Sequence, residues 1–182
     1  MPDLLLVKPS LDFLETIAAY QQAFEQAKEH LYGGAHLQDY DDLGAWIDHT
    51  QAIETEAGVI EGRAPSSTFL CMRQSDQKMV GICNIRHHLN QDFLIKRAGH
   101  IGYSICPSER RQGYAKEQLK LALIEAEKLG ITKALVTCDS HNIASEKTIL
   151  ANGGIYDNTY VDPKDHSQTK RFWIEVIKHD KS

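Results

Sequence analysis

Hydrophobic residues recur along the chain at two spacings, and these spacings predict an alternation of strands and helices. Short apolar or alternating runs, typical of strands, occupy residues 4–7, 67–73, 79–88, 99–105, 131–138, 155–161 and 171–177. Helical spacing begins near residues 10 and 42 and covers residues 115–129 and 142–152. This order of elements predicts a mixed α/β layer built around one sheet.

The helix predicted at residues 115–129 has the clearest pattern. Its apolar stripe is formed by Ala115, Leu119, Ala122, Ala126 and Leu129. Gly130 follows at once and provides a stop signal. The strand after it, at residues 131–138, is apolar throughout, as expected for a strand that is covered on both faces. Residues 89–97 are polar and show no period, which predicts an irregular connection.

The composition is that of an ordinary globular domain. The chain has 182 residues, of which 42% are hydrophobic and 25% charged, so we expect one domain spanning residues 1–182. A net charge of −5 argues against general affinity for nucleic acid or for an anionic membrane surface. The apolar runs are shorter than the ~20 residues of a spanning helix. The first residues lack the features of a signal peptide, and we expect a cytoplasmic protein.

The four cysteines give no sign of a metal site or a disulfide framework. Cys71, Cys83, Cys106 and Cys138 are widely spaced and form no C-x-x-C pair. All except Cys106 lie within strand-like runs, where a free cysteine behaves as a small hydrophobic residue. We therefore expect no bound metal.

Residues 105–116 carry the candidate chemistry: a strand ends at Pro107, a polar loop follows and a long amphipathic helix begins. The first N–H groups of a helix have no intrahelical acceptor, and the helix dipole adds about half a positive charge there. Gly113 keeps bulky side chains away, and Arg110 and Arg111 add positive charge. The segment predicts a site for a phosphate-bearing ligand. The alternative is a helix start that carries two solvated arginines.

The same segment resembles the signature of a known family. Arg110-x-x-Gly113-x-Ala115 is similar to the Q/R-x-x-G-x-G/A motif of the GNAT family of N-acetyltransferases, and Asn142-x-x-Ser145 follows in the family's order. The stretches GHIGYSICPSERRQGYA and NIASEKTILANGG further resemble an uncharacterised bacterial subgroup. The resemblance implies a GNAT-like α/β (α+β) fold. Such a fold has a mixed central sheet of about six to seven strands, about four flanking helices and splayed parallel strands that bind CoA.

The resemblance also implies acetyl-CoA as co-substrate and roles for individual positions. The main chain of residues 103–105 would pair with the pantetheine arm, and the N–H groups of residues 111–116 would hold the diphosphate. Asn142 would contact the pantetheine or the thiol end, although asparagine is also a common helix N-cap. Ser145 either reaches the same region or serves helix packing. The expected cofactor-binding residues are Tyr103, Ser104, Ile105, Arg110, Arg111, Gln112, Gly113, Tyr114, Ala115, Lys116, Asn142 and Ser145.

The catalytic residues stay unassigned, because the chain departs from the family at both usual positions. Ile149 stands where many relatives place a proton-donating tyrosine, and Gly99 stands near the position of a glutamate found in some. Tyr103 and His100 are the remaining candidates in the same strand, although strand alternation turns His100 to the other face unless a bulge intervenes.

Two further histidines and a cysteine lie close to the predicted site. His87 and His88, at the end of the preceding strand, either border the acceptor cleft, where one of them could act as a base, or form a solvated loop entrance. Cys106 lies where a thiol would meet the cofactor arm, but direct attack by an amine gives it no role.

The sequence thus predicts an N-acetyltransferase that moves an acetyl group from acetyl-CoA to a primary amine of a small molecule, peptide or protein by direct attack. The departures leave two alternatives open: a non-catalytic acyl-CoA-binding sensor, and a structural interaction protein without cofactor. The acceptor pocket is expected between the first two helices, residues 89–97 and the final hairpin. Four acidic residues there either favour a cationic amine or form a solvated face: Asp41, Asp42, Glu54 and Glu56. By analogy with the family, the last strands are a candidate homodimer interface.

Overall fold

The structure, a computed structural model, describes residues 3–176, which contain seven strands and four α-helices in the predicted order. The strands are β1 (Leu4–Val7), β2 (Ser66–Arg73), β3 (Lys78–Arg86), β4 (Ile101–Ile105), β5 (Lys133–Asp139), β6 (Ile155–Val161) and β7 (Gln168–Glu175). The α-helices are α1 (Leu14–Ala27), α2 (Leu43–Ala52), α3 (Tyr114–Lys128) and α4 (Ile143–Ala151). The last strand begins earlier than predicted, and Ile177, its predicted end, lies outside the described residues.

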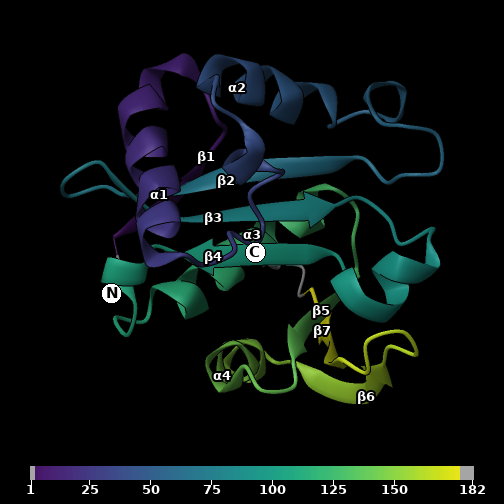
Figure 1. The fold of residues 1–182 in the computed structure, drawn as a ribbon. Helices are drawn as coiled ribbons and strands as arrows, with labels where there is room; N and C mark the ends of the chain where they lie inside the picture. The colour runs from purple at the N-terminus through teal and green to yellow at the C-terminus, as the bar shows by residue number, and fades with distance from the viewer. Residues whose placement is uncertain (1–2, 177–182) are drawn as a thin grey trace, which may run out of the picture.

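The strands form two sheets. Four of them pair in the order β1-β2-β3-β4 and three in the order β5-β7-β6, with every neighbouring pair antiparallel. The strand count agrees with the predicted central sheet, but that sheet is divided because β4 and β5, which α3 connects, do not pair with each other. Figure 1 shows the smaller sheet below β4.

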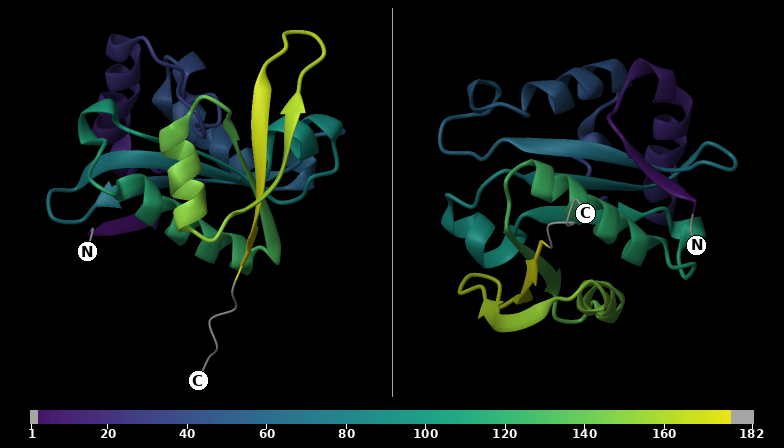
Figure 2. Two further views of the ribbon diagram at one scale, coloured as in Figure 1. Left: turned by 90° about the horizontal axis from the view of Figure 1, so that it is seen from below. Right: turned by 180° about the vertical axis from the view of Figure 1, so that it is seen from behind.

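Helices cover both faces of the larger sheet. α1 and α2 lie on one face and α3 crosses the other, while α4 lies beside the smaller sheet (Figures 1 and 2). Each face has its own core. The core under α3 includes Cys83, Leu119, Ala122, Val136, Ile149 and Phe172, and the core under α1 and α2 includes Ile17, Tyr20, Phe24, Trp46, Leu70 and Ile82. All four cysteines are buried free thiols, so they pack as hydrophobic residues.

Residues 3–176 lack two further features. This part of the chain contains no group of three or more His, Cys, Asp or Glu side chains placed to hold a metal ion. None of its helices is long and apolar enough to cross a membrane.

Local chemistry explains where the helices begin and end. Asp42 caps α2, because its Oδ1 accepts a hydrogen bond of 3.2 Å from the N–H of Ala45. α3 begins after Gly113 and is followed by Gly130, which have φ angles of +82° and +84°. Few side chains tolerate such angles, so both glycines mark a change of chain direction.

The connection between β3 and β4 is more ordered than predicted. It contains a short π-helical segment, Leu94–Ala98, and carbonyl groups in and just after this segment accept hydrogen bonds from side chains of distant elements. Arg171 donates to the carbonyl of Ile95 at 2.8 Å, Arg86 donates to that of Gly99 at 3.1 Å, and Thr137 also contributes a hydrogen bond. These partners come from β3, β5 and β7, so no local pattern could predict the segment.

The two sheets meet where β4 begins. The N–H of His100 donates to the carbonyl of Leu135 in β5 at 2.7 Å, and the N–H of Leu135 donates back to Nδ1 of His100 at 2.9 Å. Gly99 makes this approach possible, because a Cβ atom there would lie 2.5 Å from the Leu135 carbonyl oxygen. Beyond this contact β4 and β5 stay unpaired, which leaves a gap toward the end of β4.

Replacement of Gly99 by alanine tests this meeting point. Gly99 has φ +67° and ψ −167°, a conformation that essentially only glycine adopts, and the added methyl would also strike Leu135. We expect Gly99→Ala to lower the free energy of unfolding by about 3 kcal/mol in urea titrations. Gly130→Ala is the control, because Gly130 has φ +84° but nothing within 4 Å of its Cβ position. Its expected loss is about 1 kcal/mol. Equal losses would contradict the role of the close approach.

The stability of this contact should depend on pH. Burial, aided by the charge of Arg86, lowers the pKa of His100 to about 4, so the neutral ring is the form that accepts from Leu135. The unfolded chain takes up this proton near pH 6.5, and stability should therefore fall as the pH drops from about 6.5 to about 4. His100→Asn keeps an acceptor but does not titrate. We expect its stability to vary by about 3 kcal/mol less over that range. Parallel pH curves for both proteins would contradict this.

Candidate cofactor site

β4 uses half of its backbone polar groups to pair with β3. At its start the N–H of Arg86 donates to the carbonyl of His100 at 2.7 Å, and at its end the N–H of Cys106 donates to the carbonyl of Val80 at 2.8 Å. In an antiparallel pair, alternate residues form the hydrogen bonds between the strands. The even-numbered residues of β4 therefore direct their N–H and C=O groups toward β3.

The odd-numbered residues Ile101, Tyr103 and Ile105 therefore direct their N–H and C=O groups away from β3, into the gap between the sheets. No strand among the described residues pairs with this edge. The carbonyl of Ile105 accepts a hydrogen bond of 3.3 Å from Nε of Arg110. The N–H groups of Tyr103 and Ile105 are thus donors that an extended amide-bearing ligand could use.

The loop after β4 ends in an uncapped helix N-terminus. A 3₁₀ turn at Pro107–Glu109 leads to Arg111 and Gly113, both with positive φ, and α3 starts at the next residue. No side chain caps α3, and the space beside Gly113 is open to 4 Å. Within residues 3–176 the N–H groups of residues 111–116 find no acceptor. This cluster of donors at the positive end of a helix suits a phosphate or diphosphate.

A buried carboxylate that the sequence did not single out fixes this loop. Glu109 accepts hydrogen bonds from Arg73 and Lys78, each 2.7 Å long, and from Gln112 at 3.3 Å. The Lys78 and Arg73 side chains lower its pKa, so Glu109 stays ionised. Arg73 also donates to the hydroxyl of Tyr114 at 3.1 Å. In the sequence, the only sign of this contact is that two basic residues, Arg73 and Lys78, lie on either side of the β2–β3 turn.

The two arginines of the motif have different surroundings. Arg110 forms a two-bond ion pair with Glu29, with distances of 3.1 and 2.8 Å, in addition to its bond to Ile105. This geometry ties the loop to the end of α1 and turns the guanidinium away from the start of α3. Arg111 is exposed and forms no ion pair with any residue between 3 and 176. Of the two, Arg111 is therefore better placed to add charge to an anion site.

The start of α4 borders the same gap. Oδ1 of Asn142 accepts from the N–H of Ser145 at 3.1 Å, so Asn142 is a helix N-cap, and its side chain remains exposed. The hydroxyls of Ser145 and Tyr103 lie 2.8 Å apart and join α4 to β4. Asn152 donates to the carbonyl of Lys116 at 3.1 Å, which holds α4 against the first turn of α3. The unpaired edge of β4 thus lies beside the starts of α3 and α4, and the term groove is used below for the place where these three elements meet.

The positions considered for a catalytic acid or base have different surroundings in the structure. Ile149 is fully buried in the core, and Gly99 and His100 form the contact between the sheets. The buried, neutral ring of His100 favours a structural role. Tyr103 lies in the groove, where burial raises its pKa to about 12 against the opposing effect of its bond to Ser145. Its phenol therefore keeps its proton at neutral pH.

His87 and His88, which follow β3, have no hydrogen bond to the groove residues of β4, α3 or α4 within the described part of the chain. Nε2 of His87 is 2.8 Å from the hydroxyl of Ser67, and burial lowers the pKa of His87. Nε2 of His88 is 2.8 Å from a carboxylate oxygen of Glu56. Each ring thus has a partner of its own, and the structure brings neither into contact with Tyr103 or the helix start.

The acidic residues expected near an acceptor mostly have local partners. Glu54 forms an ion pair with Lys8, Glu56 bonds to His88, and Asp42 caps α2. Of these three carboxylates, only Glu54 has its charge balanced by a lysine, whereas the cap bond of Asp42 leaves its charge in place.

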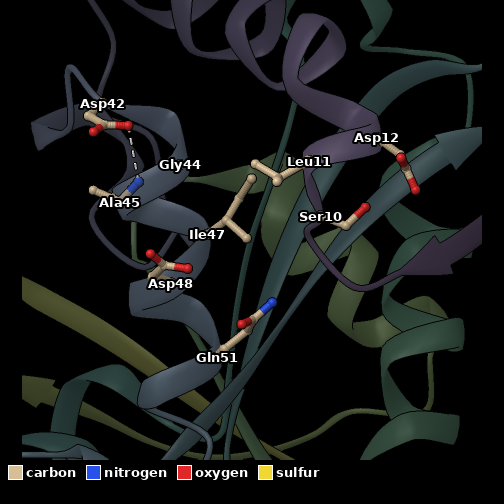
Figure 3. Close-up of a pocket in the computed structure, with 9 residues that line it drawn as sticks. All are labelled: Ser10, Leu11, Asp12, Asp42, Gly44, Ala45, Ile47, Asp48 and Gln51. Carbon is tan, nitrogen blue, oxygen red and sulfur yellow. Dashed lines mark hydrogen bonds between the residues drawn. The ribbon is translucent and has the colours of Figure 1, made fainter.

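A surface hollow lies elsewhere, between the turn at residues 11–13 and α2 (Figure 3). It is lined by Ser10, Leu11, Asp12, Asp42, Gly44, Ala45, Ile47, Asp48 and Gln51. None of the predicted cofactor-binding residues belongs to it. The open edge of β4 and the start of α3, and not this hollow, carry the candidate chemistry.

Solved structures with the same fold are acetyltransferases. A ribosomal L7/L12 alpha-N-protein acetyltransferase in complex with CoA has 15% identity and a TM-score of 0.69, over 96% of this chain and 95% of its own. The microcin C7 self immunity acetyltransferase, solved with acetyl-CoA and AMP, has 14% identity and a TM-score of 0.65, over 96% and 93%. A dodecameric spermidine N-acetyltransferase from Vibrio cholerae has 11% identity and a TM-score of 0.63, over 96% and 94%.

The sequence itself matches a family model. Among curated proteins none matches it. The model described as acetyltransferase (GNAT) domain matches residues 3–155, most of the chain, including β4, the loop and α3. This match confirms the resemblance found in the motif at residues 110–115, and it confirms acetyl-CoA as the co-substrate. The chain belongs to the GNAT acetyltransferase family.

Proposed function

We propose that this protein transfers the acetyl group of acetyl-CoA to a primary amine by direct attack. The observation that carries the proposal is the continuity of two binding features. The open edge of β4 runs directly into the loop whose N–H groups lack acceptors, so one groove offers donors for the pantetheine amides and for the diphosphate.

The residues of the groove would act mainly by placement. The N–H groups of Tyr103 and Ile105 can pair with the pantetheine arm or polarise a carbonyl oxygen as it gains charge. The N–H groups of residues 111–116 would hold the diphosphate, with Arg111 adding charge. The free amide group of Asn142 lies at the same groove. When bound, acetyl-CoA supplies an activated acyl group, and a neutral amine completes the reaction.

The acceptor is an amine of a small molecule, a peptide or a protein. Proteins of the same fold named above act on spermidine or on the amino terminus of a ribosomal protein. The bonds of Glu54 to Lys8 and of Glu56 to His88 occupy two acidic groups that a polyamine could otherwise use, which favours an acceptor with a single positive charge. A homodimer through the smaller sheet is part of the proposal, supported by the exposed Ile155 and Tyr156 on the edge strand β6.

A sensor that binds acyl-CoA without turnover is the second candidate. It is favoured by one observation: Ile149 and Gly99, which stand at the family's usual acid and base positions, are a buried core residue and a sheet contact.

The diphosphate assignment can be tested at Gly113. We expect Gly113→Leu to weaken acetyl-CoA binding by at least about 30-fold in calorimetry, because the side chain would fill the approach to the helix N-terminus. Gly130→Leu is a matched control at the other end of α3. Gly113 has φ +82° and Gly130 has φ +84°, and neither has an atom within 4 Å of the position of an added Cβ. Both variants should lose similar stability, but only the first should lose affinity. Unchanged affinity in Gly113→Leu would refute the assignment.

Turnover can be separated from binding by a thiol-release assay. Wild-type protein is mixed with acetyl-CoA and a panel of amines that contains spermidine, single amino acids and short peptides. We expect at least one amine with a single positive charge to accelerate thiol release over the rate without acceptor, and to do so better than spermidine. Tight binding of acetyl-CoA without acceleration by any amine would instead support the sensor.

A further inference from the structure

The groove contains two hydroxyl groups that face each other. The hydroxyl of Tyr103 on β4 and that of Ser145 on α4 share a hydrogen bond of 2.8 Å. Their two elements come from opposite walls of the gap, and Tyr103 also belongs to the open edge of β4. The pair therefore lies across the path proposed for the pantetheine arm and its thioester.

A proton donor at this place would assist acetyl transfer, because the sulfur leaves with the electron pair of the C–S bond. Two other polar side chains of β4 and α4 do not offer a proton to this place. The Ser104 hydroxyl points to the opposite face of β4, where it lies 2.8 Å from the hydroxyl of Tyr20. Asn142 caps α4 and carries no acidic proton. Among the groove residues named above, Tyr103 is the side chain that combines an ionisable proton with a partner for its anion.

The surroundings of Tyr103 keep its proton in place and orient its hydroxyl. The phenol is half-buried, and burial raises its pKa to about 12, so the proton is present at working pH. Ser145 holds the hydroxyl in one orientation, and the N-cap bond from Ser145 to Asn142 fixes the start of α4. A serine hydroxyl can also donate to a phenolate once the proton has left.

We propose that Tyr103 is the general acid that protonates the leaving sulfur, with Ser145 as its positioning residue; this inference rests on the proposed acetyl transfer. The amine nitrogen forms a bond to the carbonyl carbon, the C–S bond breaks, and the sulfur takes the phenolic proton. The nitrogen gives up one proton through solvent, and the Tyr103 phenolate takes it back. Products are the acetylated amine and the free thiol, so protons and electrons balance.

A binding experiment tests the contact without turnover. Calorimetry compares CoA with desulfo-CoA, which lacks the sulfur atom. Wild-type protein should bind CoA about fivefold more tightly, the effect of one hydrogen bond to the sulfur. Tyr103→Phe should bind both equally and should keep its affinity for desulfo-CoA. A preference for CoA that persists in Tyr103→Phe would overturn the proposal.

A kinetic experiment tests the proton transfer itself with the most active amine of the panel. Tyr103→Phe should lower kcat about 100-fold with little change in the acetyl-CoA dissociation constant, and Ser145→Ala should lower it about 10-fold. Tyr20→Phe is the matched control, because it removes a tyrosine–serine bond of the same 2.8 Å length on the other face of β4. Its kcat should stay within about threefold of wild type.

Replacement of Tyr103 by 3-fluorotyrosine adds a readout that a structural role would not change. The substituted phenol is more acidic, so kcat and its high-pH limit should both shift while stability stays constant. A kcat in Tyr103→Phe within about threefold of wild type would refute the acid and leave acetyl transfer intact. Wild-type protein that binds acetyl-CoA but acetylates no amine would refute the transfer and this role together.

Discussion

The exchange of two hydrogen bonds between His100 and Leu135 joins β4 to β5 at one end, and the gap exists because these two strands do not pair beyond it. The contact lies at the start of β4, so the unpaired part of the strand extends toward its end. α3 begins directly after that end. The open edge and the helix N-terminus are therefore neighbours, and an extended ligand can use both. Gly99 is part of this constraint, since any side chain there would push the sheets apart.

Charge pairs hold the loop in shape before any ligand binds. Glu109 is anchored to the β2–β3 turn by Arg73 and Lys78, and Arg110 is anchored to α1 by Glu29. These contacts use side chains and leave the N–H groups of residues 111–116 free. A loop that is already ordered loses little conformational freedom on binding, so more of the binding free energy remains available.

The sequence predicted the features that depend on local pattern. The order of strands and helices follows from periodicity, and α3 begins at Tyr114, one residue before its predicted start at Ala115. The open edge of β4 was expected only from the family resemblance, because a strand run does not reveal which of its edges is paired.

Other features could not be predicted because they join residues far apart in the chain. The bond between Tyr103 and Ser145, the pair of Arg110 and Glu29 and the π-helical segment all depend on tertiary contacts. His100 shows the limit most clearly. A histidine beside a predicted active site suggested a base, but its ring accepts a backbone N–H between two sheets.

The unpaired edge of β4 also bears on solubility. A strand with free N–H and C=O groups is normally a template for the strands of other chains, and proteins with such edges risk aggregation. Here the edge faces inward, enclosed by β5, α3 and α4, and tyrosine–serine bonds hold β4 from both faces. The fold thus keeps the unpaired N–H and C=O groups of β4 available to a ligand and shields them from strands of other copies of the chain.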